Sequence, residues 1–318
     1  MSGKGFQEML DTRLVAMVAR GDASKVAELL SKGARVDVRD RGFTPLLIAA
    51  GFGHTEVCEL LLDQGKANIE ETEPLGENSA LNQAASTGNA STVALLLSKG
   101  ARVDTRNKSG ATTLLIAAQF GQTEVCKLLL EKGKANIEEA GSIDETALSI
   151  AARSGDAKTV ALLLSKGARV DTRDKNRDTP FLAAAEEGHI EVCELLLAKG
   201  SNLEESNAGQ FTALHKAAAC RDQSLLLLLL SHKANVNSRS RTEATPLHTA
   251  SQEGHLTSVV ALLQAGADPL LAQNDGALPI HLAYLRNNSD VVRILVDQGG
   301  CSPDQVTTAQ NMYITQSG

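Results

Sequence analysis

Histidine and cysteine are the residue types of this 318-residue chain that could act as bases, nucleophiles or metal ligands. Six of the seven histidines fall into two recurring slots, after a glycine or three residues after a Thr or Leu: His54, His189, His255, His215, His248 and His281. Equivalent histidines belong to different copies of a repeated unit. Packed helices lie about 10 Å apart, so histidines in neighbouring copies are separated by about that distance. One zinc ion needs its ligands within about 2 Å of itself, so we predict structural roles for these histidines and no metal site.

Three of the five cysteines, Cys58, Cys126 and Cys193, recur at intervals of 68 and 67 residues beside a leucine-rich ridge. Lying two repeats apart, they cannot pair with one another, and we expect them to pack as small buried side chains. Cys220 and Cys301 follow no pattern. An odd number of cysteines without a framework of spacings indicates a reducing compartment.

Known catalytic motifs are missing from the sequence. Gly-Lys occurs at 65–66 and 133–134, but an alanine follows it where a phosphate-binding loop has Ser or Thr. The sequence contains no H-E-x-x-H and no G-x-S-x-G. We therefore predict a protein that is not an enzyme, with no catalytic, cofactor-binding or metal-binding residues.

Charge and hydropathy disfavour further classes of function. The formal net charge is −7, from 31 basic and 38 acidic residues, whereas nucleic-acid-binding proteins need a positive surface. The longest run of purely apolar residues, Leu225–Leu230, is far below the ~20 residues of a membrane-spanning helix. The first ten residues lack the apolar core of a secretory signal. We expect an intracellular protein, cytoplasmic or nuclear, with no membrane partner.

A short motif repeats along the chain and defines the elements that must position these residues. Sequences such as TPLLIAA and TPLHTAS begin at steps of 33 to 35 residues, after a degenerate copy at Thr12. The eight copies in register begin at Thr44, Ser79, Thr112, Thr146, Thr179, Thr212, Thr245 and Leu278. Length alone would suggest about two globular domains, but an internal repeat of this period indicates one array of small units.

Each unit is predicted to form a pair of short helices. Thr44 is placed to cap a first helix, and Pro45 occupies its favoured first position. A glycine-containing turn leads to a second helix with the spacing V-x-x-L-L. A closing glycine then allows a left-handed backbone at Gly65, Gly100, Gly133, Gly167, Gly200 and Gly266. Helices this short are not stable alone in water, so neighbouring pairs must stack into a solenoid.

The period of 33 and the motif T-P-L-H-x-A resemble the ankyrin repeat over about residues 11–301. The resemblance implies a mainly α solenoid of helix-turn-helix units with projecting β-hairpin fingers, about nine units including the caps. We expect a single domain over 1–301, with an N-terminal cap at about 11–40, full units over about 41–274 and a C-terminal cap at about 275–301. Residues 302–318 lose the pattern and are expected to form a flexible tail. An extra residue at Lys66 and at Lys134 predicts a slightly longer finger.

Ankyrin proteins typically bind partners on a concave face, which consists of the fingers and the exposed sides of the first helices. The resemblance directs attention to positions that core packing leaves free: the residue before the motif Thr and the two before the turn glycine. Phe43 and Phe211 hold the first position, and Phe52, Phe120, Glu186 and Glu187 hold the second. Exposed aromatic residues are frequent binding anchors, and packing on an adjacent finger is the alternative for each.

Charge alternates along the predicted fingers. Basic residues occupy every second finger, at Arg39 and Arg41, Arg106 and Lys108, Arg173 and Lys175, and Arg239 and Arg241. Acidic residues occupy the fingers between, as at Glu70, Glu71, Glu138, Glu139, Glu204 and Glu205. Residues 92–106 recur unchanged at 159–173, so duplication of a solvated face is one explanation. The other is an extended polypeptide along the groove, with the charges setting its register.

These observations predict a non-enzymatic scaffold that binds a protein or an extended peptide and is monomeric alone. The alternatives are a self-associating structural element and the recognition arm of a larger complex. Asn237, in Asn235-Val236-Asn237, matches the position at which ankyrin proteins can carry a β-hydroxylated Asn, and is a candidate modification site. The sequence implies no cofactor.

Overall fold

The computed structural model describes residues 3–302, 304 and 305, which form short helices joined by loops. The chain divides into two compact units, Met1–Arg169 and Val170–Gly318, and each is described by itself. The single domain expected over 1–301 stays a prediction. The tail expected over 302–318 lies mostly outside the described residues.

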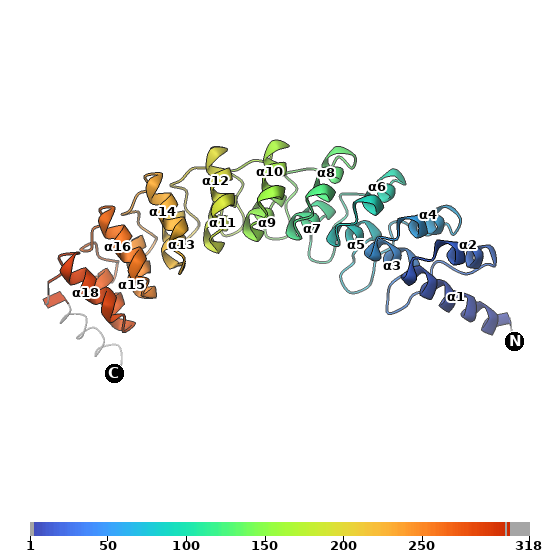
Figure 1. The fold of residues 1–318 in the computed structure, drawn as a ribbon, viewed down its shortest axis with the longest axis horizontal. Coiled ribbons are helices and arrows are strands. Elements are labelled where there is room, and N and C mark those ends of the chain that lie inside the picture. Colours follow the sequence, from blue (N-terminus) through green and yellow to red (C-terminus); the bar gives the residue numbers. More distant parts are fainter. Residues whose placement is uncertain (1–2, 303, 306–318) are drawn as a thin grey trace. The chain divides into compact units, whose positions relative to one another are not determined.

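Unit 1 consists of stacked helix pairs (Figure 1). Its first helices are α1 (Gly3–Arg20), α3 (Pro45–Phe52), α5 (Ala80–Ser86), α7 (Thr113–Gln119) and α9 (Ala147–Ser154). Its second helices are α2 (Ala23–Ser31), α4 (Thr55–Asp63), α6 (Ala90–Ser98), α8 (Thr123–Glu131) and α10 (Ala157–Ser165). Each first helix contacts the next first helix, and each second helix the next second helix. Helix α1 begins well before residue 11, where the N-terminal cap was expected to start.

Unit 2 repeats this arrangement. Its first helices are α11 (Pro180–Glu187), α13 (Ala213–Ala219), α15 (Pro246–Glu253) and α17 (Pro279–Leu285). Its second helices are α12 (Ile190–Ala198), α14 (Ser224–Ser231), α16 (Leu256–Gln264) and α18 (Ser289–Asp297). The first helices contact one another in chain order. The mainly α architecture of stacked pairs predicted from the repeat is confirmed.

Local sequence explains how each first helix begins and ends. The Thr44 hydroxyl accepts a hydrogen bond from the Leu47 N–H at 3.5 Å, and Pro45 occupies the first turn of α3. Gly53 ends the helix in the left-handed region with φ 75°, where glycine has no Cβ to clash. Between these ends, small residues such as Ala49 are fully buried and let neighbouring helices approach closely. Phe181 occupies the position in α11 that Leu46 holds in α3, and it is fully buried.

The closing glycines fulfil two different roles. Gly100, Gly167, Gly200 and Gly266 have φ of 89 to 92°, the left-handed conformation predicted for them. After α4, however, the left-handed residue is Lys66 with φ 56°, and after α8 it is Lys134 with φ 53°. A Cβ on Gly65 would lie 2.7 Å from the Leu61 carbonyl oxygen, so this glycine permits close packing instead. The extra residue therefore lies at the end of the second helix and lengthens the base of the finger, not its tip.

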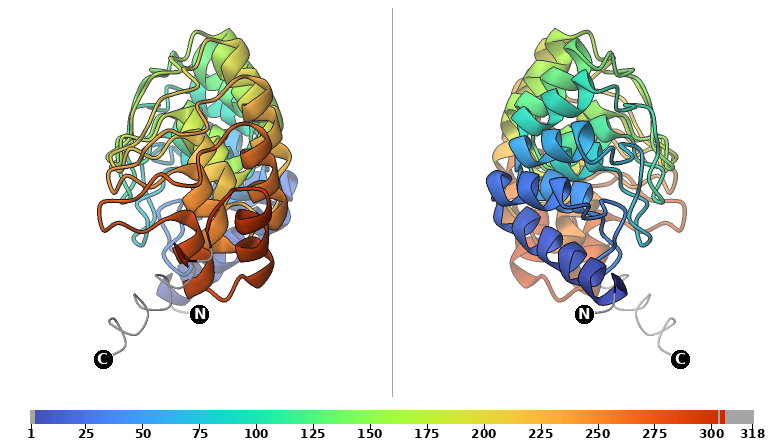
Figure 2. Two further views of the ribbon diagram at one scale, coloured as in Figure 1. Left: turned by 90° about the vertical axis from the view of Figure 1, so that its left-hand side faces the viewer. Right: turned by 90° about the vertical axis from the view of Figure 1, so that its right-hand side faces the viewer.

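The fingers connect one helix pair to the next and project to one side of the helices within each unit (Figure 2). Isolated antiparallel bridges close three of them, at Asp40–Phe43, Thr72–Ser79 and Ser206–Thr212. No named strand occurs in the described residues, so the hairpins expected from the resemblance are limited to single bridges. Isolated backbone hydrogen bonds, such as that from the Lys108 N–H to the Gly76 carbonyl oxygen at 2.9 Å, link successive fingers, and side chains add further contacts.

Candidate binding surface

The candidate binding surface consists of the fingers and the first helices, which we call the finger face. Phe52 ends α3 and is 65% exposed, and Phe120 follows α7 and is 56% exposed. The Phe52 ring stacks on His54 with centroids 5.8 Å apart. In unit 2, Phe211 is 38% exposed. Phe43 is half-buried where its finger closes against Asp40. The two most exposed of these phenylalanines thus lie in unit 1.

The basic residue at the base of a finger holds that finger to the next one. Nη1 of Arg106 donates hydrogen bonds to the carbonyl oxygens of Gly110, in its own finger, at 2.7 Å, and of Ala140, in the next finger, at 2.8 Å. Its Nη2 forms an ion pair with Glu139 of the next finger. Arg106 therefore clamps two successive fingers.

Arg39 and Arg173 form the same clamp. Each donates to a carbonyl of its own finger and one of the next, and each pairs with an acidic residue of the next finger, Glu71 and Glu205 respectively. Arg239 donates to the Ala272 carbonyl of the next finger at 3.3 Å. The basic and acidic residues that alternate along the fingers are therefore largely paired with one another within the chain.

A second acidic residue recurs in these loops, and its carboxylate accepts a hydrogen bond from a backbone N–H of the following repeat. The Glu70 carboxylate accepts the Arg102 N–H at 2.9 Å, and Glu138 and Glu204 accept the corresponding N–H groups of Arg169 and Asn235 at the same distance. Asn237 occupies this position in the next copy, where its Oδ1 accepts the Asp268 N–H at 2.9 Å. The candidate modification site thus carries an inter-repeat hydrogen bond.

A small set of finger-tip charges stays exposed after these contacts. It comprises Arg41, Lys108, Lys175 and Arg177 among the basic residues and Asp40, Glu77 and Asp144 among the acidic ones. Within the described part of the chain, none of them forms a side-chain ion pair or hydrogen bond. Arg241 differs, because it donates to the Ala208 carbonyl oxygen of the preceding finger. These exposed tips are the charges available to a partner.

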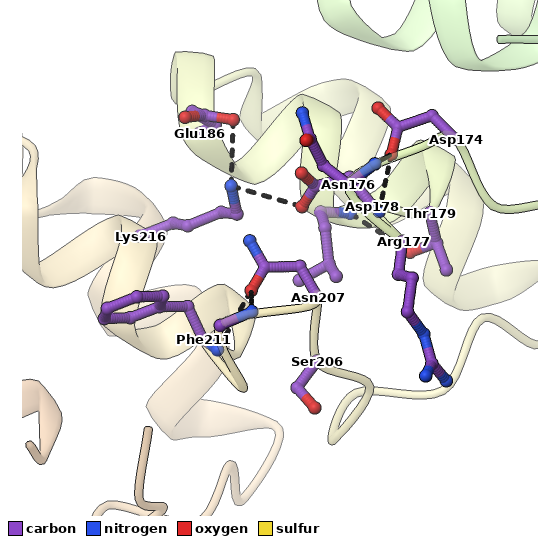
Figure 3. A network of polar contacts seen from close by, with 12 residues as sticks. Asp174, Asn176, Arg177, Asp178, Thr179, Glu186, Ser206, Asn207, Phe211 and Lys216 are labelled. Carbon is purple, nitrogen blue, oxygen red and sulfur yellow. Dashed lines mark hydrogen bonds and ion pairs between the residues drawn. The ribbon is translucent and has the colours of Figure 1, made fainter. Parts of the chain in front are cut away.

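A lysine buried in unit 2 joins two repeats (Figure 3). Lys216 Nζ lies 2.8 Å from Glu186 Oε2 and 3.3 Å from Asp178 Oδ1, and the Lys216 side chain is only 10% exposed. Burial raises the pKa of Asp178, and the nearby Lys216 partly offsets that rise. Sequence reasoning missed this residue. The signal was a lysine at a position of the first helix that holds Ile48 or Ile116 in other repeats.

The charged candidates of α11 behave differently from each other. Glu186 is held by Lys216, although about half of its side chain stays exposed. Glu187 is exposed at the position that Phe52 and Phe120 hold in unit 1. The end of α11 is therefore acidic at the position where α3 ends in a phenylalanine and α7 is followed by one.

The histidines of the T-P-L-H slots lie inside unit 2. Nδ1 of His215 accepts the Thr212 N–H at 3.2 Å, so its Nε2 carries the proton and donates to the Ala244 carbonyl oxygen at 2.9 Å. His248 bridges Thr245 and Ala277 in the same way. Burial lowers the pKa of both histidines to about 4. These rings connect successive repeats as neutral groups.

The three periodic cysteines are buried and unpaired by disulfides. Burial raises the pKa of Cys58, Cys126 and Cys193 to about 12. A thiol with such a pKa is not a nucleophile at neutral pH. In the part of the chain that the structure describes, no group of three or more His, Cys, Asp or Glu is arranged to hold a metal ion.

A hollow of about 400 Å³ lies on the finger face of unit 1. Its walls are α1, with Val15, Ala16 and Ala19, and the first finger, with Val38 and Arg39. The hollow is mainly apolar, and the charged residues of its lining, Asp11, Arg39 and Asp40, are of both signs.

Stacked helix pairs joined by projecting loops define a class of repeat proteins, and comparison with known families identifies it. A family model described as ankyrin repeats in three copies matches residues 13–107, 81–174, 148–240 and 221–307. These overlapping matches extend over 13–307, and the chain belongs to the ankyrin repeat family. Such repeats are in general protein-interaction modules. No helix within the described residues is long and apolar enough to cross a membrane.

Several curated proteins are similar to parts of the chain. The ankyrin repeat and KH domain-containing protein mask-1 of Caenorhabditis elegans is 34% identical over 124 residues, which is 39% of this chain and 5% of that protein. The human ankyrin repeat and KH domain-containing protein 1 is 38% identical over 103 residues, 32% of this chain and 4% of that protein. The mouse ankyrin repeat domain-containing protein 17 is 42% identical over 71 residues, 22% of this chain and 3% of that protein. The matched part thus spans a twentieth or less of each relative.

Proposed function

We propose that this chain is a non-enzymatic scaffold that binds a protein or an extended peptide on the finger face. The observation that supports the proposal is the exposure of Phe52 and Phe120. The fold does not need an aromatic residue there, because α11 holds the exposed Glu187 at the same position and also ends on a left-handed glycine, Gly188 with φ 76°. Large exposed aromatic side chains that the fold does not require are typical anchors of protein interfaces.

The charges of the finger face divide into two roles. Arg39, Arg106 and Arg173 position the fingers, and the exposed tips, such as Lys108 and Asp144, are available to orient a partner. Charges at the rim of an interface mainly affect association rate and register. A cytoplasmic location and a monomeric state belong to the same proposal. Sedimentation velocity at increasing concentration tests the latter, since a concentration-dependent dimer would favour the self-associating alternative.

The proposal is tested by affinity capture from a cell lysate with the full-length chain as bait. The decisive variant is Phe52→Ala/Phe120→Ala, and the matched control is Leu227→Ala, which removes an exposed apolar side chain of the second helix α14. Charge is tested with Lys108→Glu, because replacing Arg106 would release a finger. We expect wild type and L227A to retain the same proteins and the double variant to lose them. Equal recovery by all three would contradict the proposed binding face.

A further inference from the structure

Unit 1 contains two copies of one surface. Residues 44–71 and 112–139 are identical at 22 of 28 positions, and the copies place Phe52 and Phe120 at an offset of 68. The finger tips that follow repeat the pattern, with Leu75 78% exposed and Ile143 52% exposed at the same offset. Each copy therefore presents an exposed aromatic residue and an exposed aliphatic finger tip.

The exposed aromatic residue persists although its surroundings have changed. The second helices of the two copies differ at the exposed positions 59, 63 and 64, which are Glu, Asp and Gln in one copy and Lys, Glu and Lys in the other. A third copy in unit 2 has Glu187 in place of the phenylalanine. The helix pair thus tolerates a charge at this position, so its fold does not require the phenylalanine.

We infer that unit 1 holds two equivalent subsites for one extended polypeptide segment that carries two apolar side chains about six residues apart. This inference rests on the proposed function. Two repeats stacked at about 10 Å each separate the subsites by ~20 Å. An extended chain rises about 3.3 Å per residue, so ~20 Å corresponds to about six residues. Because six is even, both side chains point to the same side of the segment.

The free finger-tip charges complement a particular sequence of ligand charges. In chain order the exposed tips of unit 1 carry both charges at Asp40 and Arg41, then an acidic residue at Glu77, a basic one at Lys108 and an acidic one at Asp144. Both the Glu77 finger and the Lys108 finger lie between α3, which ends at Phe52, and α7, which precedes Phe120. The segment is therefore expected to carry a basic and an acidic residue between its two apolar residues, facing Glu77 and Lys108, and a further basic residue facing Asp144.

The test selects peptides from a random 12-residue display library on the full-length chain and measures their affinities by fluorescence anisotropy. We expect the selected peptides to carry two apolar residues that are six positions apart. Each chain should bind one such peptide. Phe52→Glu and Phe120→Glu, which introduce the residue type that α11 holds at Glu187, should each weaken binding at least tenfold, with Thr87→Ala as the control at the same position of the intervening repeat. A peptide with one apolar residue replaced by Ser should become insensitive to one of the two phenylalanine variants. Circular dichroism of each variant checks that it is folded.

Other outcomes separate this inference from the proposed function. Peptides with a single apolar residue that bind twice per chain, or with another spacing, would overturn the two-anchor segment and leave the scaffold function standing. Peptides that bind wild type and both glutamate variants equally would also overturn it. Failure of folded wild type to bind any peptide more tightly than a denatured control would contradict peptide binding on the finger face itself.

Discussion

Acidification is expected to destabilise unit 2 through its buried histidines. His215 and His248 are neutral when folded, because burial lowers their pKa from 6.5 to about 4. The unfolded chain therefore takes up protons at a higher pH than the folded chain does. Stability is complete above the unfolded pKa near 6.5 and is lost as pH falls from there toward 4. Unit 1 has no histidine in this slot and holds Leu47, Asn82, Leu115 and Ser149 instead.

The size of the effect follows from the two pKa values. A fall in pKa from 6.5 to about 4 lowers the free energy of unfolding by roughly 3 kcal/mol per histidine once the pH lies below both values. At pH 5 the folded histidines are still neutral and the unfolded ones are charged, and the loss relative to pH 7 is about 2 kcal/mol for each. Between pH 7 and pH 5, protonation of His215 and His248 in the unfolded chain should therefore lower the free energy of unfolding by about 4 kcal/mol in total.

The assay is urea unfolding of wild type and His248→Leu at pH 7 and pH 5. Leucine is the native residue at this slot of α11, as Leu182, so the variant keeps the repeat pattern. The variant loses the bonds to Thr245 and Ala277 and is less stable at pH 7. Between pH 7 and pH 5, however, it should lose about 2 kcal/mol less than wild type. The control His232→Leu, at an exposed histidine, should follow wild type. Equal losses in wild type and H248L would refute the reasoning.

Three further predictions concern stability and reactivity. Lys233→Gly should raise the free energy of unfolding by about 1 kcal/mol, because Lys233 has φ 66° where other repeats have glycine; an unchanged urea midpoint would contradict this. Arg106→Ala should lower the same quantity by about 1–2 kcal/mol through loss of the finger clamp, whereas Lys108→Ala should change it by less than about 0.5 kcal/mol; similar effects of both would dismiss the clamp. Cys58, Cys126 and Cys193 should react with a thiol reagent at pH 8 only as the chain unfolds, because burial holds their pKa near 12; fast labelling of the native chain, read by peptide mass spectrometry, would disagree.

The helix pairs could be predicted from the sequence because each of their signals is local. Thr44, Pro45 and Gly53 define the beginning and end of α3 by their own backbone chemistry, and the spacing of apolar residues indicates the buried side. The buried state of Cys58 and Phe181 follows from the same spacing. Gly65 was misassigned because the extra residue moves the left-handed position to Lys66, and a Cβ on Gly65 would meet both the Leu61 carbonyl oxygen of its own repeat and Val36 of the preceding one.

The roles of the finger charges could not be predicted because they depend on contacts between repeats. Arg106 and Lys108 are two residues apart and carry the same charge, yet one clamps the next finger and the other is exposed. Their difference depends on the Ala140 carbonyl, 34 residues further along the chain. Lys216 was missed for the same reason, because its partners Asp178 and Glu186 belong to the preceding repeat. The exposed phenylalanines needed no such contacts, and their positions in the motif were sufficient.

The most direct test of the binding face is amide hydrogen exchange of the full-length chain with and without a bound partner or selected peptide. We predict slower exchange in the fingers and at the ends of the first helices, around Phe52, Lys108 and Phe120. The amides of the second helices α4 and α8 should exchange as in the free protein. Protection confined to the second helices would place the partner on the opposite side and contradict the proposed function.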